Sequence, residues 1–411
     1  MHVLLVFHAP PFPPDIGPSR RHYHVLSETM KRHDVTVLSL GTPSERIQLL
    51  EHTGVEPSRV HYVAGDRTTA RKALRAAAYL TTARSHFRRL RIRRMQQAID
   101  RVTRAARFDV AYFSTVMLGC YRLPRGIPLV GDTHNVEHDT LMRAAAAAPE
   151  RWRRVYYGAQ AVLTRREERR HLAKFDIVCA TSPRDRSVLH ALAPRIRIDV
   201  VPNGIDLEKY SPPPTSRRED GVLLFTGLMS YYPNQHAVLR FARNVLPLVR
   251  QRVPHARLIV AGADPSCAVR ALAGEHVEIT GRVADVRPYY ARAHAVVVPL
   301  SIGGGTRVKV LEAMAMGVPV VSTALGCEGL DVVDGRSVLI GDSDAALADA
   351  VVRVLQSPTL AESLVTHGRE VARQYGWGRI GQVLDAVMQT AASERAPFGR
   401  APSAAGACRA Y

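Results

Sequence analysis

Cysteine is scarce in this chain of 411 residues, which has five, at positions Cys120, Cys179, Cys267, Cys327 and Cys408. They lie far apart and form no CxxC pair, so the sequence predicts neither a disulfide framework nor a cysteine zinc site. Long apolar runs are also absent, because no stretch approaches the about 20 apolar residues that span a bilayer. The opening MHVLLVFHAPPFPP lacks a basic n-region, and we expect a buried strand there rather than a signal peptide. These absences favour the cytoplasm, with any membrane contact peripheral and at the inner face.

Acidic residues are few relative to basic ones: 37 Asp and Glu face 56 Lys and Arg, for a net charge of +19. The excess is concentrated in residues 1–200, which hold 34 basic and 18 acidic residues. The segment 71–107 alone carries twelve Lys and Arg against the single acid Asp100. An apolar stripe at helical spacing runs through it, formed by Ile92, Met95, Ile99, Val102 and Ala106. We expect this segment to contact an anionic membrane surface, and a merely solvated basic face is the alternative.

Aromatic residues make up only 6% of the chain, and no helix-turn-helix, zinc-finger or RNA-module signature is present. Nucleic acid is therefore not an expected partner. A GxGxxG loop after the first strand is also missing, which argues against a nicotinamide-dependent dehydrogenase. The pair Asp342 and Asp344 has the spacing of a metal-binding DxD, but it opens a predicted helix, and helix capping explains it better. The sequence predicts no metal site.

What the chain does contain is an alternation of short Val-, Ile- and Leu-rich runs with helical patterns, which predicts parallel sheets covered by helices. Six strands are expected in the first half, at 2–7, 35–40, 109–113, 127–130, 177–181 and 198–202. Six more are expected in the second half, at 222–226, 257–261, 276–279, 295–300, 318–322 and 337–340. The predicted fold class is α/β, with two Rossmann-like doubly wound domains facing each other across a cleft.

The domain organisation follows from a linker-like segment at 203–221, which contains three consecutive prolines and a charged polar run. We expect an N-terminal domain at 1–208, completed by a C-terminal helix at 373–395. The second domain is expected at 209–372, and the low-complexity tail 396–411 is expected to be disordered. In open sheets of this kind, ligands bind outside the carboxyl ends of the strands, so the cleft is the expected site.

The most informative segment is SIGGGTRVKVLEAMAMGVPVVSTALGCEGL at 301–330. The glycines Gly303, Gly304 and Gly305 allow a tight turn and close approach to a ligand, and a helix opening at about Thr306 directs free N–H groups to the same place. Two cations in its first turn, Arg307 and Lys309, oppose the helix dipole unless an anion is bound. A phosphate cradle is therefore predicted. Glu312, on the same helical face, could accept hydrogen bonds from ribose hydroxyls, or pair with Lys309 on the surface.

This segment resembles the C-terminal signature of family 4 glycosyltransferases, through the run LEAMAMGVPVVST. VVPNGIDLEKYSP (200–212), LLFTGLMSYYPN (223–234) and GRVADVRPYYARAHAVVVPL (281–300) resemble further motifs of the family in the same order. The resemblance extends to about residue 395. It implies a GT-B fold and a retaining, metal-independent transferase that uses a nucleotide-diphosphate sugar as co-substrate and no other cofactor. The GGGTR form is similar to a subgroup associated with exopolysaccharide and envelope glycan assembly.

The resemblance also implies donor-side roles. Glu312 matches the second glutamate of the E-x7-E motif, the ribose ligand, whereas the first glutamate falls at Gly304 and is missing. The basic pair that follows the first glycine of the nucleotide domain has no counterpart after Gly227. Arg307 and Lys309 are expected to take over the diphosphate, and base contacts are expected from backbone near Arg282 and Val283.

In the N-terminal domain, the resemblance implies that His134, in GDTHNVEH after the strand at 127–130, hydrogen-bonds the donor sugar. Capping of the next helix by Asp132 and Asn135 is the alternative reading of this loop. Glu137 and Asp139 are further candidates.

The loop HAPPFPPDIGPSRRHYHVL (8–26) matches the one that meets acceptor and donor in the family, and it places Gly17, Arg21 and His24 on the acceptor side. A rigid surface loop is the alternative for Arg21 and His24.

The predicted function is transfer of a sugar from a nucleotide-diphosphate sugar to a glycan, lipid-linked or small-molecule acceptor, with retention of anomeric configuration. Two alternatives remain open at this point. One is a nucleotide-sugar epimerase on the same fold, and the other is a non-catalytic basic protein that binds nucleic acid or membrane.

Overall fold

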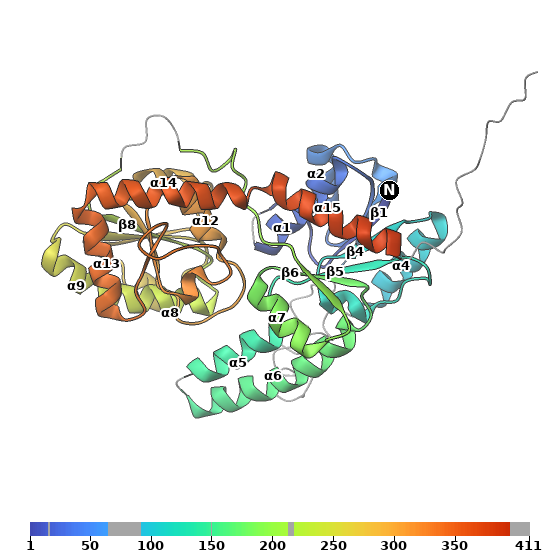
Figure 1. Cartoon of the computed structure of the whole chain (residues 1–411), viewed down its shortest axis with the longest axis horizontal. Coiled ribbons are helices and arrows are strands. Elements are labelled where there is room, and N and C mark those ends of the chain that lie inside the picture. Colours follow the sequence, from blue (N-terminus) through green and yellow to red (C-terminus); the bar gives the residue numbers. More distant parts are fainter. Residues whose placement is uncertain (15–16, 65–91, 149, 213–217, 395–411) are drawn as a thin grey trace, which may run out of the picture.

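The computed structural model of the chain describes residues 1–14, 17–64, 92–148, 150–212 and 218–394. Two parallel sheets, each covered by helices, lie end to end along the molecule (Figure 1). The first sheet has seven strands and the second has six. The predicted α/β fold class with two doubly wound halves is confirmed.

The first sheet has the strand order β3-β2-β1-β4-β5-β6-β7. Its strands are β1 (His2–Phe7), β2 (Asp34–Leu40), β3 (Val60–Val63), β4 (Val110–Phe113), β5 (Leu129–Asp132), β6 (Ile177–Ala180) and β7 (Arg197–Val200). The six strands expected from the sequence are present, and β3 was missed. Its four residues, VHYV, do not form a continuous apolar run. The two central side chains are only half-buried, because β3 lies at the edge of the sheet.

The α-helices in the described part of this half are α1 (Gly17–Met30), α2 (Pro43–Thr53), α4 (Arg93–Ala105), α5 (Glu137–Ala147), α6 (Arg151–Leu172) and α7 (Pro183–Leu192). Side chains alternate along β1, so Leu4 and Val6 join one core and Val3, Leu5 and Phe7 join the other. The apolar stripe predicted within 71–107 lies on α4 and packs in the first of these cores. Residues 71–91 of that basic segment lie outside the described residues.

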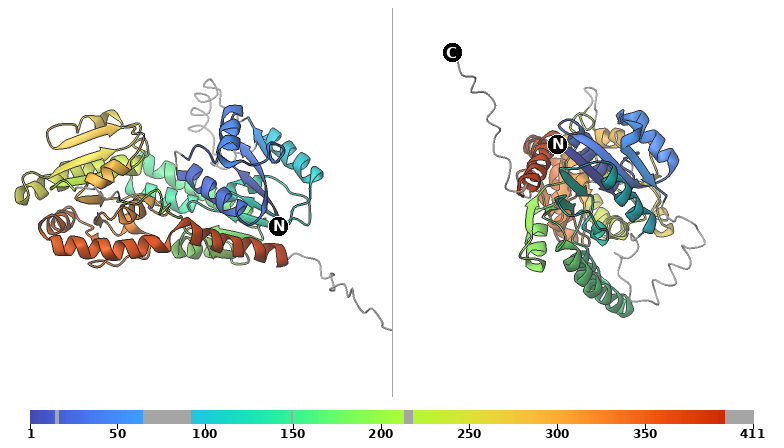
Figure 2. Two further views of the ribbon diagram at one scale, coloured as in Figure 1. Left: turned by 90° about the horizontal axis from the view of Figure 1, so that it is seen from above. Right: turned by 90° about the vertical axis from the view of Figure 1, so that its right-hand side faces the viewer.

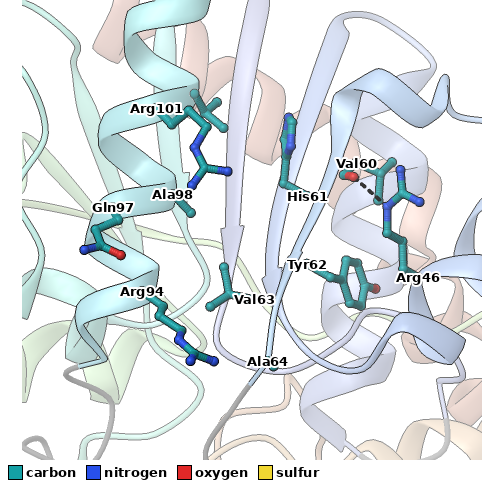
Figure 3. Close-up of a pocket in the computed structure, with 11 residues that line it drawn as sticks. Arg46, Val60, His61, Tyr62, Val63, Ala64, Arg94, Gln97, Ala98 and Arg101 are labelled. Carbon is teal, nitrogen blue, oxygen red and sulfur yellow. Dashed lines mark hydrogen bonds between the residues drawn. The ribbon is translucent and has the colours of Figure 1, made fainter.

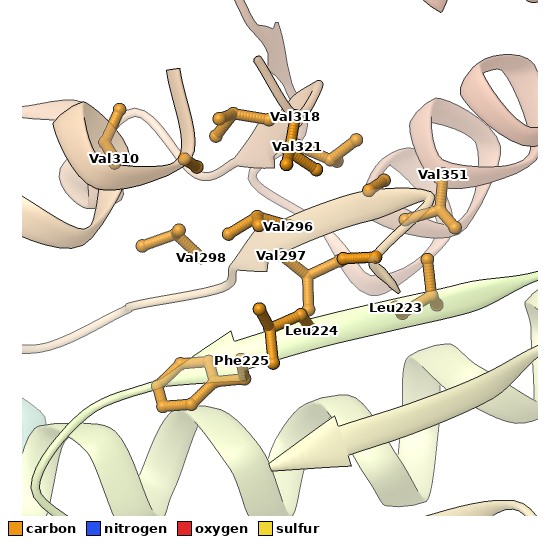
Figure 4. Packing of buried hydrophobic residues seen from close by; sticks show 14 of the residues in the cluster. Leu223, Leu224, Phe225, Val296, Val297, Val298, Val310, Val318, Val321 and Val351 are labelled. Carbon is orange, nitrogen blue, oxygen red and sulfur yellow. The ribbon is translucent and has the colours of Figure 1, made fainter. Parts of the chain in front are cut away.

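The second sheet has the order β10-β9-β8-β11-β12-β13. Its strands are β8 (Val222–Thr226), β9 (Arg257–Ala261), β10 (Val277–Gly281), β11 (Ala295–Val298), β12 (Val320–Ser322) and β13 (Leu339–Ile340). Its helices are α8 (Tyr232–Arg240), α9 (Leu246–Arg252), α10 (Cys267–Arg270), α11 (Arg287–Arg292), α12 (Val308–Ala315), α13 (Asp344–Gln356) and α14 (Pro358–Gln374). Figure 4 shows Leu224, Val297 and Val351 in its buried core, where each such side chain contributes about 1.5–3 kcal/mol.

The last helix, α15 (Trp377–Glu394), returns to the first half of the molecule. It follows α14 along the long axis and packs on α1 (Figure 2). Ile380, Leu384 and Met388 are buried in the core that holds Leu5 of β1. This helix lies within the predicted range 373–395.

The chain passes between the two halves twice, and the two crossings lie side by side. The backbone N–H of Ile205 donates to the carbonyl of Tyr375 at 2.8 Å, and the N–H of Trp377 donates to the carbonyl of Ile205 at 3.2 Å. Hydrogen bonds therefore join the two segments that connect the halves.

Candidate active site

The predicted donor residues gather where the strands of the second sheet end. Gly227 follows β8, Arg282 and Val283 follow β10, and the glycine loop 303–305 follows β11. Because these strands are parallel neighbours, their carboxyl ends meet at one edge of the sheet. Arg282 is exposed there and Val283 is half-buried.

The glycine loop lies against the N-terminal half of the protein. Gly303 and Gly305 have φ values of +126° and +76°, a region that other residues rarely adopt. A Cβ on Gly304 would lie 2.7 Å from the Oγ1 of Thr140, and one on Gly305 would lie 2.9 Å from the carbonyl oxygen of His134. The carboxylate missing at position 304 therefore has no room here, because α5 of the other half occupies its place.

Arg307 is the residue that precedes α12, so the helix begins at Val308 rather than at Thr306 as the sequence suggested. Its side chain is 8% exposed. The guanidinium Nη1 donates to the carbonyls of Gly304 and Gly305, whereas its Nε and Nη2 are buried without a hydrogen-bond partner among the described residues. Burial lowers the pKa of this group.

Lys309 lies beside Arg307, on the first turn of α12. Its Nζ donates to the Oδ1 of Asn234 at 3.0 Å, and it lies 4.0 Å from the ring centroid of Phe225. A Cβ on Gly227 would approach this Nζ to 2.9 Å, so Gly227 borders the same space. Burial and the neighbouring Arg307 lower the pKa of Lys309 to about 7.

Within the described residues, neither Arg307 nor Lys309 has a carboxylate within 4.0 Å. A buried guanidinium beside a half-buried ammonium, with no paired anion, is costly in the free protein because the desolvation of these charges is not offset. This pair, which the glycine loop borders, is therefore suited to an anion.

Glu312 is also buried, but its carboxylate is engaged by protein groups. Arg20 donates from Nη1 to its Oε1 at 2.8 Å, and the hydroxyl of Tyr290 donates to its Oε2 at 2.8 Å. The alternative of a surface pair with Lys309 is wrong, because Glu312 is buried, Lys309 is half-buried and each bonds to other partners. The predicted ribose contact would require a hydroxyl group to share or replace these partners.

His134 follows β5 and faces the glycine loop, since its carbonyl lies beside Gly305. Burial lowers the pKa of its imidazole to about 4, and its Nε2 has no hydrogen-bond partner among the described groups. Two further histidines lie next to it, His8 after β1 and His22 in α1. We refer to these three residues as the three-histidine cluster.

Neither Asp132 nor Asn135 caps α5, whose N-cap residue is Val136, so that alternative is wrong. Of the further candidates, Glu137 has its pKa raised to about 7 by burial and by the nearby Glu168. Asp139 forms ion pairs with Arg143 at 3.0 Å and Arg184 at 2.8 Å.

The residues predicted on the acceptor side, Gly17, Arg21 and His24, lie along one face of α1, but the side chains of Arg21 and His24 are engaged within the protein. Arg21 is 2% exposed and uses its guanidinium entirely within the protein, on the Asp132 carboxylate and on acceptors of residues 201–203. No donor of Arg21 is left for an acceptor, and its observed role is to tie α1 to β5 and to the segment that leaves the first domain. His24 stacks on Trp377 with ring centroids 4.7 Å apart, which joins α1 to α15. Gly17 opens α1, with open space where a Cβ would lie.

Contacts across the two halves surround the glycine loop. Arg143 of α5 donates to both carboxylate oxygens of Glu328, at 2.8 and 3.0 Å, and to the carbonyl of Gly303 at 3.3 Å. The hydroxyl of Thr306 donates to the carbonyl of Thr181 at 3.4 Å. The ion pairs and hydrogen bonds that hold the halves together thus converge on the predicted donor site.

A separate hollow of about 560 Å³ lies at the outer edge of the first sheet, between α2 and α4 (Figure 3). Arg46, His61, Arg94 and Arg101 line it, so it is basic. It borders Ala64, the last described residue before the basic segment.

Among the described residues, Cys120, Cys179, Cys267 and Cys327 form no disulfide, and the DxD pair binds protein groups. Asp344 pairs with Arg240, and the N-cap of α13 is Ser343 rather than an aspartate. No helix in the described ranges is long and apolar enough to cross a membrane.

Sequence reasoning missed several side chains that shape the site, among them Arg20, Tyr290, Asn234 and Thr140. Arg20 and Glu312 are 292 positions apart, and no local pattern connects them. Asn234 could have been noticed, since it lies in the first turn of α8, the helix that follows β8 and Gly227.

Two family models match successive parts of the chain. "Glycosyltransferase Family 4" matches residues 17–209, and "Glycosyl transferases group 1" matches residues 220–357. The first half of the chain thus matches the glycosyltransferase family 4 model and the second half matches the glycosyl transferases group 1 model, on a GT-B fold.

Among curated proteins, the chain is 31% identical over 204 residues to the phosphatidyl-myo-inositol mannosyltransferase of Mycobacterium leprae (strain TN), covering 47% of this chain and 54% of that protein. It is 28% identical over 235 residues to the GDP-mannose-dependent alpha-(1-6)-phosphatidylinositol monomannoside mannosyltransferase of Mycobacterium tuberculosis (strain ATCC 25618 / H37Rv), covering 51% and 60%. The chain spans about half the length of the curated relatives it matches.

Among solved structures, the chain resembles Anabaena HepE in complex with UDP and glucose, with a TM-score of 0.67 and 16% identity over 95% of this chain and 100% of that one. It also resembles the sucrose-phosphate synthase of Thermosynechococcus elongatus, with a TM-score of 0.68 and 16% identity over 96% and 100%. At this level of identity the likeness concerns the fold.

Proposed function

We propose that this protein transfers a sugar from a nucleotide-diphosphate sugar to an acceptor held between its two halves. The observation that carries the proposal is the pair formed by Arg307, which is buried, and Lys309, which is half-buried, neither of which has a carboxylate within 4.0 Å among the described residues. Two guanidinium nitrogens of Arg307, Nε and Nη2, have no hydrogen-bond partner among the described residues. A diphosphate supplies adjacent anionic oxygens for both side chains, and charge-assisted hydrogen bonds of this kind are about twice as strong as neutral ones.

In the proposed reaction, the bond from the anomeric carbon to the phosphate oxygen breaks and a bond to the acceptor oxygen forms on the same face of the sugar. The acceptor proton passes to the departing phosphate. Negative charge that develops on this phosphate is stabilised by Arg307 and Lys309, which are in place before the reaction and require no reorganisation. Because these cations meet the phosphates, the step needs no metal ion.

Both halves of the protein contribute to this site. His134 would hydrogen-bond the sugar from the first half, and Glu312 would accept from the ribose in the second half. The contacts of Thr306 and Gly303 with the first half close the site around the glycine loop, which would keep water from the donor. Retention of configuration and the residues assigned to the donor remain parts of the proposal.

We propose a hexose donor and a lipid-linked acceptor as the first substrates to test. The relatives are named as mannosyltransferases, one as GDP-mannose-dependent, and their names specify phosphatidylinositol acceptors. The donor could equally belong to the UDP series, since HepE was solved with UDP and glucose. The assay therefore compares GDP-mannose with UDP-glucose.

We also propose a peripheral contact with an anionic membrane, which would suit a lipid acceptor. The helix pair α5 and α6 projects from the first half (Figure 1). Trp152, Val155 and Val162 are 61%, 68% and 59% exposed at helical spacings that put them on one face of α6. Exposed Arg165 and Arg169 lie on the same helix. An apolar stripe with arginines suits the interface of a bilayer, where each cation contributes about 1 kcal/mol.

The test of the function is calorimetric titration with UDP, GDP and ADP, followed by transfer assays with the nucleotide that binds. One nucleoside diphosphate should bind to the wild type, with affinity lost in Arg307→Met and Lys309→Met. Arg336→Met, which changes an exposed arginine, serves as the matched control. Equal binding by all three variants and the wild type would remove the basis of the proposal.

The membrane contact has its own test, sedimentation with vesicles that contain phosphatidylglycerol. Trp152→Ser with Val155→Ser should reduce binding several-fold, and neutral phosphatidylcholine vesicles should bind weakly. Binding that is independent of lipid charge and of these substitutions would exclude this surface.

A further inference from the structure

The three-histidine cluster has the composition and layout of a metal site that the sequence does not reveal. His8, His22 and His134 come from three separate segments, and one ring nitrogen of each lies within 4.8 Å of those of the other two. The ring centroids are 4.8 Å apart for His8 and His22, 5.7 Å for His8 and His134, and 5.4 Å for His22 and His134. Since β1, β4 and β5 are neighbours in the sheet, the loops after β1 and β5 meet α1 at this point.

Hydrogen bonds on the far side of two rings fix which nitrogen is free. The Nδ1 of His22 lies 3.0 Å from the carbonyl oxygen of Ala9, and because a carbonyl only accepts, this nitrogen carries the proton. The Nε2 of His22 then carries a free lone pair. It is buried, in a residue of 0% exposure, and has no partner among the described groups. His134 is bonded to the backbone of Ser114, and its Nε2 is likewise buried and unpartnered.

The third ring is oriented by the same serine. The Nδ1 of His8 lies 3.0 Å from the Oγ of Ser114, which also accepts from the backbone N–H of His8 at 3.1 Å. A histidine whose second nitrogen is held by a carbonyl or hydroxyl is the usual arrangement around a protein-bound metal, because the bond sets the tautomer and the ring orientation. The nearby Asp132 is not available as a ligand, since Arg21 and Tyr112 hold both of its oxygens.

We propose that the three-histidine cluster is a binding site for a divalent transition-metal ion, with Zn²⁺ as its first candidate. Imidazole ligands suit Zn²⁺, Cu²⁺ and Ni²⁺, whereas Mg²⁺ and Ca²⁺ require oxygen ligands that this cluster lacks. Zn–N bonds of about 2.0–2.1 Å in tetrahedral geometry bring ligand nitrogens to about 3.4 Å, so each ring would shift by less than about 1 Å. His8 and His134 are only partly buried, which leaves the fourth position for water or another small ligand.

A bound ion would engage the Nε2 of His134, the group expected to contact the donor sugar. Zinc and sugar would then compete, and zinc would inhibit transfer. This consequence rests on the proposed function, whereas metal binding itself does not.

The experiment uses the full chain, freed of metal with a chelator and then dialysed. Zn²⁺ is titrated calorimetrically, and Co²⁺ is added separately because its visible absorption reports four-coordinate nitrogen ligation. We expect one strong equivalent of Zn²⁺ and a tetrahedral Co²⁺ spectrum that Zn²⁺ abolishes. Removal of a group that hydrogen-bonds a metal-ligating side chain already weakens metal affinity by about 10–100-fold. Removal of a ligand itself should therefore weaken zinc affinity by at least about 100-fold.

His8→Gln and His22→Asn are the test variants, and His24→Gln, two positions along α1 from His22, is the matched control. His22 is buried and stacks on Phe7 with ring centroids 4.9 Å apart, so the His22 variant could unfold. His8 is only partly buried, so its variant should fold and still test the site. Circular dichroism checks folding, and Arg307→Met should bind zinc normally. Absence of a strong equivalent in the wild type, or its persistence in folded His8→Gln, overturns the site. Failure of sugar transfer in all proteins would reject the proposed function and leave the metal result intact.

Discussion

Replacing Arg307 by methionine should separate binding from stability. Arg307 is 8% exposed, and among the described residues its guanidinium donates only to the carbonyls of Gly304 and Gly305, with Nε and Nη2 unpartnered. The loss of those two charge-assisted hydrogen bonds costs about 1.5–3 kcal/mol each, and relief of the uncompensated buried charge, worth several kcal/mol, offsets that cost. We therefore expect the free energy of unfolding to change by less than about 1 kcal/mol.

Binding of a nucleoside diphosphate should respond much more strongly. If Nε and Nη2 both donate to phosphate oxygens, two charge-assisted hydrogen bonds of about 1.5–3 kcal/mol each are lost. The lower bound of about 3 kcal/mol corresponds to a roughly 100-fold larger dissociation constant, because each 1.4 kcal/mol is a factor of about ten.

The assay pairs calorimetric titration with urea unfolding, on the wild type, Arg307→Met and the exposed control Arg336→Met. A variant that unfolds several kcal/mol more easily would show that Arg307 is structural. A variant that keeps the wild-type affinity would show that its unpartnered N–H groups do not meet phosphate. Either result would refute the reasoning.

Three further predictions concern neighbouring residues. Arg21→Met should destabilise the fold by about 3–5 kcal/mol in urea unfolding, because it leaves the fully buried Asp132 without its cation, and a change under 1 kcal/mol would contradict this. Lys309 has a pKa of about 7 in the free protein. A bound diphosphate would raise this pKa, so Lys309 would stay protonated to a higher pH in the complex. Nucleoside diphosphate affinity should therefore fall from pH 7 to pH 9, by up to tenfold per pH unit, whereas Lys309→Arg should give a flat calorimetric profile. Gly304→Glu should lower the rate of sugar transfer at least tenfold, because its Cβ would lie 2.7 Å from the Oγ1 of Thr140. Adding Thr140→Gly to the same chain should restore part of the rate, and equal rates in the single and double variants would argue against this clash.

The strands and the phosphate-site loop could be predicted from the sequence because their signals are local. A buried parallel strand appears as a run of Val, Ile and Leu whatever it packs against, and six such runs in each half predicted the two sheets. β3 escaped because half of its four residues are polar or aromatic and only half-buried. Arg307 and Lys309 were found because they stand two positions apart after three glycines, so no tertiary information was needed to place them together.

The partners of these residues were decided by the tertiary structure alone. The sequence suggested that Arg21 meets an acceptor, yet it pairs with Asp132, 111 positions away, within the core. Arg20 contacts Glu312, which is 292 positions away in the sequence. A side chain at position 304 would clash with Thr140, which belongs to the other half. His8, His22 and His134 form no spacing motif, and only the adjacency of β1, β4 and β5 brings them together. Spacing along the chain determines which residues share a turn, whereas strand order and the approach of the two halves determine which distant side chains share a site.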